Sequence, residues 1–76
     1  MTLTELSSVL REMYKNAPRG EQVTMIHLFG IRYADEILSS GYSPKEIILA
    51  AEITPNHTNQ LYGGIRLARY VKERST

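Results

Sequence analysis

Apolar residues recur at steps of three and four along most of the chain, which is the spacing of one side of an α-helix. The first such stretch begins after Thr2, which stands three residues before Glu5 as in a capping box, and it ends before the Pro-Arg-Gly segment at residues 18–20. A second stretch runs from about residue 24 to residue 40. Its Gly30 either lets the first helix approach closely or marks a break into two shorter helices.

The clearest local signal is the segment Ser43-Pro44-Lys45-Glu46. Serine is a helix cap, proline suits the first helical position, and glutamate three residues after the serine completes a capping box. The apolar residues 47–51 that follow predict a short helix that is largely buried.

Thr54-Pro55 repeats the pattern of a cap followed by proline, so a last helix is expected after a sharp turn, running toward Arg74. Gly63-Gly64 could divide this helix, because two adjacent glycines cost about 2 kcal/mol in a helix interior.

These elements predict an all-α fold. We expect a single domain over residues 1–76, built as a compact bundle of four to five short helices, with a helix-turn-helix-like unit at about residues 43–72. No segment shows the alternation of a β-strand. In a helix-turn-helix, the second helix is the one offered to the major groove of DNA.

Charge and composition change this picture only slightly. The chain of 76 residues has a net charge of +1 and no cysteine, which leaves out disulfides and thiolate metal sites. Residues 41–76 carry five basic and three acidic side chains, against four and five in residues 1–40. A DNA-binding helix or an ordinary solvated helix face would explain this bias equally well. Because the N-terminus lacks a signal-peptide pattern and no apolar run approaches about 20 residues, we expect a cytoplasmic protein without a membrane partner.

Residues 43–62 resemble the helix-turn-helix families of bacterial regulators, in which a segment such as E-I-A-x-x-L-G-I-S-x-x-T-V is common. Glu46-Ile47-Ile48 begins the match, and residues 51–54 stand where the hydrophobe, turn glycine, hydrophobe and capping serine would be. Glu52 replaces the glycine, so a different backbone shape is expected at the turn. Ile48 replaces the small residue that lets the two helices approach. The runs IHLFGIRYA and GGIRLARYV are similar to a group of small bacterial proteins described as helix-turn-helix-like, which have no settled function.

The last helix opens with polar residues that suit base recognition. Amide side chains can pair with adenine and arginine with guanine in the major groove, so the candidate base contacts are Asn56, Asn59 and Arg66. The candidate phosphate contacts, which position the protein on DNA without reading its sequence, are Lys45, Tyr62 and Arg69.

Other chemistry finds little support in the chain. His27 and His57 lack a histidine or carboxylate partner at helical spacing, so both are interpreted as structural and no metal site is expected. Asp35 and Glu36 would point about 100° apart on a helix and do not form an acid–base pair. A chain this short also leaves little room for a catalytic pocket. We therefore expect no enzyme activity, no cofactor and no small-molecule substrate.

The leading hypothesis is a small transcriptional regulator that binds double-stranded DNA with its last helix. A homodimer is weakly favoured, because two half-sites about 34 Å apart match a two-fold protein. The alternative is a protein-interaction module on a helix-turn-helix-like scaffold without DNA binding. The near-neutral charge, Glu52 at the turn, and a surface that Leu28 and Phe29 would form with Tyr14 or Tyr70 motivate this alternative.

Overall fold

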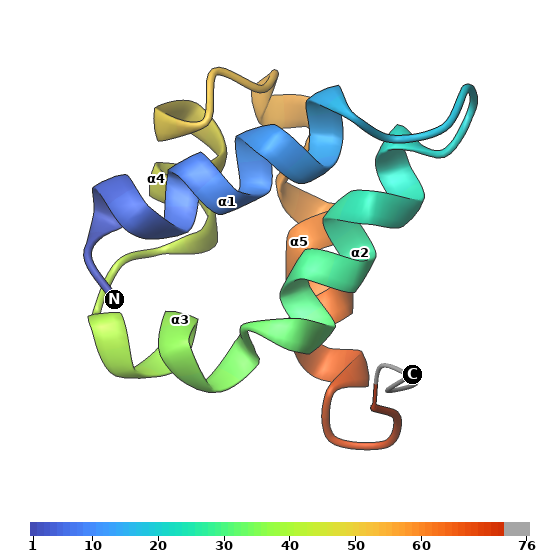
Figure 1. Ribbon diagram of the computed structural model, residues 1–76. Coiled ribbons are helices and arrows are strands. Elements are labelled where there is room, and N and C mark those ends of the chain that lie inside the picture. Colours follow the sequence, from blue (N-terminus) through green and yellow to red (C-terminus); the bar gives the residue numbers. More distant parts are fainter. Residues whose placement is uncertain (73–76) are drawn as a thin grey trace.

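The computed structural model describes residues 1–72, which contain helices and no strands (Figure 1). The elements in chain order are α1 (Leu3–Lys15), α2 (Gln22–Arg32), α3 (Ala34–Ser40), α4 (Pro44–Ala50), the 3-10 turn η1 (Pro55–His57) and α5 (Thr58–Leu67). The all-α prediction and the expected number of short helices are confirmed. No helix within residues 1–72 is long and apolar enough to cross a bilayer.

The helices pack around a central pair, α2 and α5, which have the most extensive helix–helix contact in the molecule. In Figure 1, α1 crosses in front of the bundle and contacts both α2 and α4. The short helix α3 leaves the lower end of α2 and leads back toward α4. The termini of α4 and α5 are joined through η1 at the upper edge of the view.

One apolar core joins these elements. Its largest fully buried side chains are Leu6, Leu10, Ile26, Phe29, Ile37, Ile47, Ile48 and Leu61. Each such side chain contributes roughly 1.5–3 kcal/mol by leaving water. Because α1, α2, α3, α4 and α5 all supply at least one member, the core fixes the arrangement of the α4–α5 unit relative to the rest of the bundle.

Both predicted capping boxes are present. The Glu5 backbone N–H donates to Thr2 Oγ1 over 3.1 Å, and the Thr2 N–H donates to Glu5 Oε1 over 2.8 Å. Ser43 and Glu46 make the same reciprocal pair at 3.2 Å each, with Pro44 in the first turn of α4. The pKa of the Glu5 carboxyl is lowered, chiefly by the hydrogen bond from the Thr2 backbone and to a smaller extent by that from the Thr2 side chain.

The helix expected over residues 24–40 is two helices, and the break lies at Tyr33 rather than at Gly30. Tyr33 has φ −112° and ψ 20°, which ends α2 and precedes α3. Gly30 does allow a close approach, but the approaching helix is α5 and not α1. A Cβ atom on Gly30 would lie 2.9 Å from the Leu61 carbonyl oxygen and 2.9 Å from the Ile65 amide nitrogen.

Gly63-Gly64 does not divide the last helix, since α5 runs through both residues. Packing against α2 explains the glycine at position 64, because a Cβ atom there would collide with the His27 carbonyl oxygen of that helix. The helix ends at Leu67, earlier than expected, and hydrogen-bonded turns follow it to Val71. The last part of the predicted run toward Arg74 lies outside the described residues.

Two burial predictions are wrong. α4 was expected to be largely buried, but Leu49 is 50% exposed and Ala50 also faces solvent, because only one side of this short helix contacts the core. The partner surface expected around Leu28 and Phe29 does not exist. Phe29 is a fully buried core residue, and Leu28 is half-buried.

Candidate nucleic-acid interface

The turn between α4 and η1 is a helix C-terminus of the Schellman type. The Glu52 N–H donates to the Leu49 carbonyl over 3.0 Å, and the Ile53 N–H donates to the Ile48 carbonyl over 3.1 Å. Glu52 has φ 62°, the left-handed conformation that glycine adopts most easily. The expectation of a different backbone shape at this position is therefore wrong, because the glutamate adopts the conformation of the glycine that it replaces.

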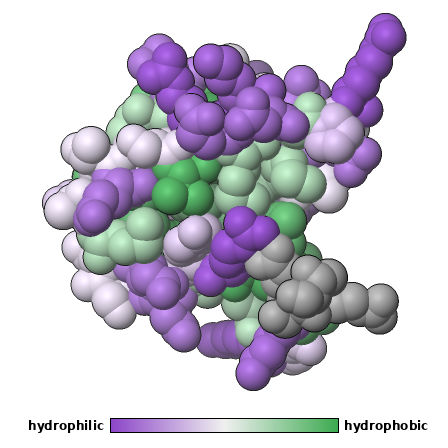
Figure 2. All heavy atoms as spheres, in the orientation of Figure 1, coloured by the Kyte–Doolittle hydropathy of each residue, from purple (hydrophilic) through white to green (hydrophobic). Residues whose placement is uncertain are grey.

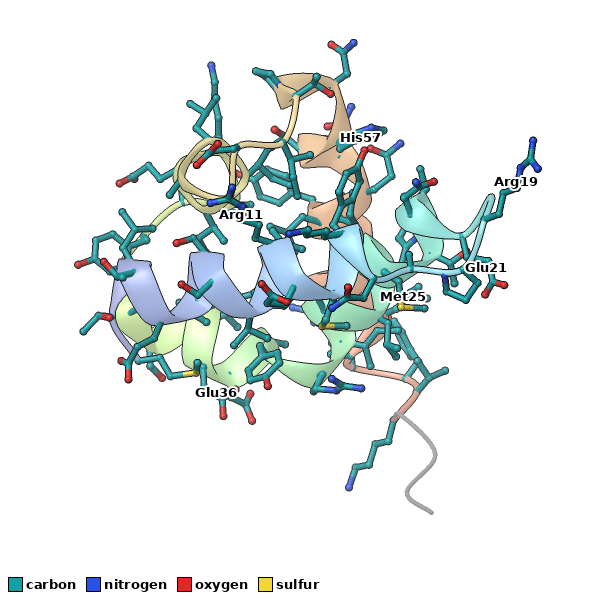
Figure 3. The ribbon with its side chains drawn as sticks, turned by 45° about the horizontal axis from the view of Figure 1, so that its top comes forward. Arg11, Arg19, Glu21, Met25, Glu36 and His57 are labelled. Carbon is teal, nitrogen blue, oxygen red and sulfur yellow. The ribbon has the colours of Figure 1, made fainter. Side chains whose placement is uncertain are left out.

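Glu52 also fixes the turn to the first helix. Arg11 Nη1 of α1 donates to Glu52 Oε1 over 3.0 Å, which connects positions 41 residues apart in the sequence. In Figure 3, Arg11 extends from α1 toward α4. Both side chains are more than half exposed, so the pair is worth only about 0.2–1 kcal/mol.

α4 and α5 pack together with Ile48 at the position where the related families have a small residue. Ile48 is fully buried, and Ile53 beyond the turn is 5% exposed in the same core cluster. An apolar contact between these two positions commonly accompanies this type of helix end. The isoleucine is thus part of the packing of α4, which still contacts α5.

The candidate base contacts are all exposed, but they do not lie on one continuous rod. Asn56 belongs to the 3-10 turn η1, whereas Asn59 and Arg66 belong to α5. Pro55 begins η1, and the α-helical hydrogen bonding starts only at Thr58. Asn56 therefore precedes the helix that carries the other two side chains.

The candidate phosphate contacts are also exposed. Lys45 stands in the first turn of α4, Tyr62 on α5 is 43% exposed, and Arg69 lies two residues beyond the end of α5. At about 100° per residue, Asn59, Tyr62 and Arg66 fall on one stripe of α5. On its other side, Leu61 and Gly64 are buried.

The positive charges at this unit are available to a partner. Among residues 1–72, Lys45, Arg66 and Arg69 form no ion pair with another side chain. Acidic groups lie close by, however. Arg66 lines one hollow together with Glu46 and an adjoining one together with Asp35. The surface around Arg66 is therefore mixed in sign rather than uniformly basic.

These two hollows form a continuous groove between α3 and α5, which we call the α3–α5 groove. Its lining includes the larger side chains of Leu38, Tyr42, Tyr62 and Ile65, and its charged side chains are Asp35, Glu46, Arg66 and Arg69. Three of the six predicted contact residues, Tyr62, Arg66 and Arg69, thus line the groove. The other three, Asn56, Asn59 and Lys45, are not among its lining residues.

The exposed apolar part of this groove is what the sequence pattern missed. Leu38 is 71% exposed, although the spacing of a single helix over residues 24–40 sets it beside the buried side. The break at Tyr33 keeps the buried side in phase, since Ile26, Ala34 and Ile37 are all buried, and Leu38 lies next to that side in solvent. No proline or glycine at position 33 signals the break.

The two histidines take part in packing. The His57 ring lies 6.1 Å from the Tyr14 ring, centroid to centroid, and His57 is half-buried where η1 meets α1 (Figure 3). His27 is half-buried beside Gly63 of α5. Within the described part of the chain, no three histidine, aspartate or glutamate side chains are grouped in a way that could hold a metal ion.

Comparison with known proteins gives one match. A family model described as an HTH-like domain matches residues 2–74. No curated protein and no solved structure gives a significant match. The description of the family names a fold and no activity. Because the match extends over nearly the whole chain, this protein belongs to the family of HTH-like domains.

Proposed function

We propose that this protein binds double-stranded DNA, with η1 and α5 entering the major groove. The observation that carries the proposal is the exposed stripe on α5 that begins with Asn59, together with the exposed Asn56 in the preceding turn η1. The opposite side of α5 is held against α2, so the stripe is presented by a helix that the core fixes in place.

The dimensions of α5 suit this role. Its ten residues span about 15 Å at 1.5 Å per residue, and the major groove is about 12 Å wide. Asn56 and Asn59, at the leading end, would pair with adenine edges. Arg66, two turns further along, would reach a guanine or a phosphate. Each well-formed bidentate contact discriminates against a wrong base by about 1–3 kcal/mol.

Lys45, Tyr62 and Arg69 are the proposed phosphate contacts. The two cations are exposed and unpaired within residues 1–72, so binding DNA breaks no existing ion pair at these positions. Attraction to phosphates supplies most of the sequence-independent affinity. Glu46 and Asp35 beside Arg66 oppose it, which favours modest affinity for random DNA.

We extend the proposal to a role as a small transcriptional regulator of the bacterial cytoplasm that acts by binding and not by catalysis. The support is the membership in a family of HTH-like domains together with the exposed amides. Asp35 and Glu36, the adjacent carboxylates, are both exposed on α3, a setting that offers no desolvated acid or base.

Selection from a pool of random DNA duplexes tests the proposal. The wild-type protein should enrich a consensus that contains adenine at one or two positions. The Asn59→Ala protein should lose one of these preferences while its melting temperature stays unchanged, since Asn59 is exposed. Gln22→Ala, an exposed amide at the start of α2, is the matched control and should select the same consensus as wild type. Failure of wild type to enrich any sequence would contradict specific recognition.

A protein-interaction role without DNA binding is the second candidate. The observation that favours it is the α3–α5 groove, where Leu38, Tyr42 and Tyr62 expose apolar surface. This role predicts a stoichiometric protein complex that survives nuclease treatment, with no duplex binding at low salt. Duplex binding that depends on Asn59 would exclude it as the sole function.

A further inference from the structure

The α3–α5 groove collects exposed apolar side chains from three segments. Leu38 of α3 is 71% exposed, Tyr42 of the following loop 37% and Tyr62 of α5 43%. The two hollows that form the groove measure about 390 and 440 Å³ and share Leu38, Ile65 and Arg66. Contiguous exposed apolar surface of this kind marks an interaction site more often than scattered apolar residues do.

The walls of the groove carry charges of opposite sign. Asp35 belongs to the α3 side, whereas Arg66 and Arg69 belong to the α5 side and to the turn that follows it. All three are exposed, and none forms an ion pair among residues 1–72. A partner that fits this groove must therefore present a cation opposite α3 and an anion opposite α5.

We propose that the α3–α5 groove is the interface between two copies of this chain. A two-fold axis along the groove sets the α3 wall of one copy against the α5 wall of the other. Asp35 then opposes Arg69 of the second copy, and the reverse pair forms at the same time, as an isologous interface requires. The surface is thus complementary to itself in charge, while Leu38, Tyr42 and Tyr62 supply the apolar centre.

The molecule is large enough for such an interface. A standard interface buries about 800 Å² on each partner. The chain exposes 5170 Å², so each copy would cover about a sixth of its surface. Complexes of this size have dissociation constants from about the micromolar range downward.

The dimer and the DNA complex compete for three side chains, so the DNA contacts of those side chains belong to the monomer. The dimer covers Tyr62, Arg66 and Arg69, and it leaves Asn56, Asn59 and Lys45 outside the groove. Self-association is measured without DNA, and reading of adenine is measured with Asn59→Ala. The failure of one proposal is therefore distinguishable from the failure of the other.

Sedimentation equilibrium of the full chain without DNA is the first test. At about 100 μM, well above a micromolar dissociation constant, the wild-type protein should sediment at twice its mass of 8.6 kDa. Leu38→Glu should raise the dissociation constant of the dimer at least tenfold. Leu49→Glu, the same substitution at a 50% exposed site on α4 outside the groove, should leave it unchanged. A wild-type protein of monomer mass at this concentration, or equal effects of the two variants, would overturn the proposal.

Charge reversal supplies a sharper test of self-complementarity. Asp35→Arg alone and Arg69→Glu alone should each sediment as monomers, because each places like charges opposite one another twice. An equimolar mixture of the two should recover the dimer mass, since both facing pairs then have opposite signs. Circular dichroism of each variant establishes that it is folded. A mixture that stays at the monomer mass would refute the interface.

Discussion

Gly30 of α2 and Gly64 of α5 each leave free the space that the backbone of the other helix occupies. A Cβ atom on Gly30 would lie 3.0 Å from the Gly64 carbonyl carbon, and 2.9 Å from both the Ile65 amide nitrogen and the Leu61 carbonyl oxygen. A Cβ atom on Gly64 would meet the His27 carbonyl group one turn before Gly30. The two glycines together set the distance between α2 and α5, and thereby the depth at which α5 lies in the fold.

Gly64→Ala should be strongly destabilising. The added methyl group meets backbone atoms of α2, which cannot move aside as a flexible side chain would. Overpacking of this kind costs about 1–3 kcal/mol or more, and only about 1 kcal/mol returns from the better helix propensity of alanine. We expect a net loss of about 2 kcal/mol, seen as a drop of roughly 8–16 °C in the melting temperature.

Gly63→Ala is the matched control next to it in the same helix. Its Cβ atom would meet only the ring of His27, at 3.4 and 3.5 Å, and that side chain can shift. The higher helix propensity of alanine should then stabilise the protein by up to about 1 kcal/mol. Equal melting temperatures for the two variants would show that the glycines do not set the approach of α2 and α5.

In the turn that precedes η1, replacing a residue by glycine should raise the stability of the protein. Glu52→Gly should stabilise the protein by up to about 1 kcal/mol. The left-handed conformation costs a residue with a side chain about 1–2 kcal/mol, whereas the exposed pair with Arg11 returns about 0.2–1 kcal/mol. Chemical denaturation of wild type and variant measures the difference.

Two further variants separate strain from charge at this position. Glu52→Ala keeps the unfavourable backbone conformation and loses the ion pair, so it should be less stable than Glu52→Gly by about 1 kcal/mol. Arg11→Ala should lower stability by less than about 1 kcal/mol. If Glu52→Ala is more stable than Glu52→Gly, the backbone conformation of Glu52 is not strained.

Glu5 gives a prediction for the dependence of stability on pH. Its pKa is lowered from 4.5, mainly because the carboxylate accepts a hydrogen bond from the Thr2 backbone N–H and secondly because of the Thr2 side chain, so the folded state favours the carboxylate. The stabilisation is complete above the ordinary pKa and is lost as the pH falls through the lowered one. The difference in melting temperature between wild type and Glu5→Gln should shrink progressively below pH 4.5. A difference that stays constant down to pH 2 would contradict this origin.

Two arginine variants distinguish a specific DNA interface from a general attraction between positive charge and DNA. Arg66→Ala should weaken binding to a selected duplex by about 1–3 kcal/mol and leave the melting temperature nearly unchanged, because the side chain is exposed. Arg19→Ala removes an equal charge from the loop between α1 and α2, where Arg19 projects away from the bundle (Figure 3). Fluorescence anisotropy should show nearly wild-type affinity for this control. Equal losses for both variants would reduce the interface to a general electrostatic attraction.

Local signals predicted the N-terminal caps of α1 and α4. Thr2 with Glu5, and Ser43 with Glu46, form the capping boxes that their three-residue spacing indicates. Such features depend on atoms within one helical turn, so the sequence contains all that determines them. The exposure of Asn59 and Arg66 likewise follows from the phase of a single helix that begins at a known place.

Features that depend on distant segments could not be predicted in this way. The break at Tyr33 has no local breaker, and the partner of Gly30 is 31 or more residues away in the sequence. The α3–α5 groove likewise depends on how α3 and α5, which are distant in the sequence, lie relative to each other. Figure 2 also shows apolar side chains at the surface, in the middle of the face drawn there and between hydrophilic side chains. The spacing of apolar residues along a helix does not distinguish such surface positions from core positions.

Salt-dependent binding of a fluorescent random-sequence duplex is the decisive test of whether this protein binds DNA. Among the proposed phosphate contacts, only the cations Lys45 and Arg69 release counterions, and the uncharged Tyr62 does not. The logarithm of the binding constant should therefore fall with the logarithm of the salt concentration with a slope of about −1.8, and Lys45→Ala should make the slope shallower by about 0.9. The contradicting result is no change in anisotropy at about 50 mM salt, where attraction to phosphates is strong.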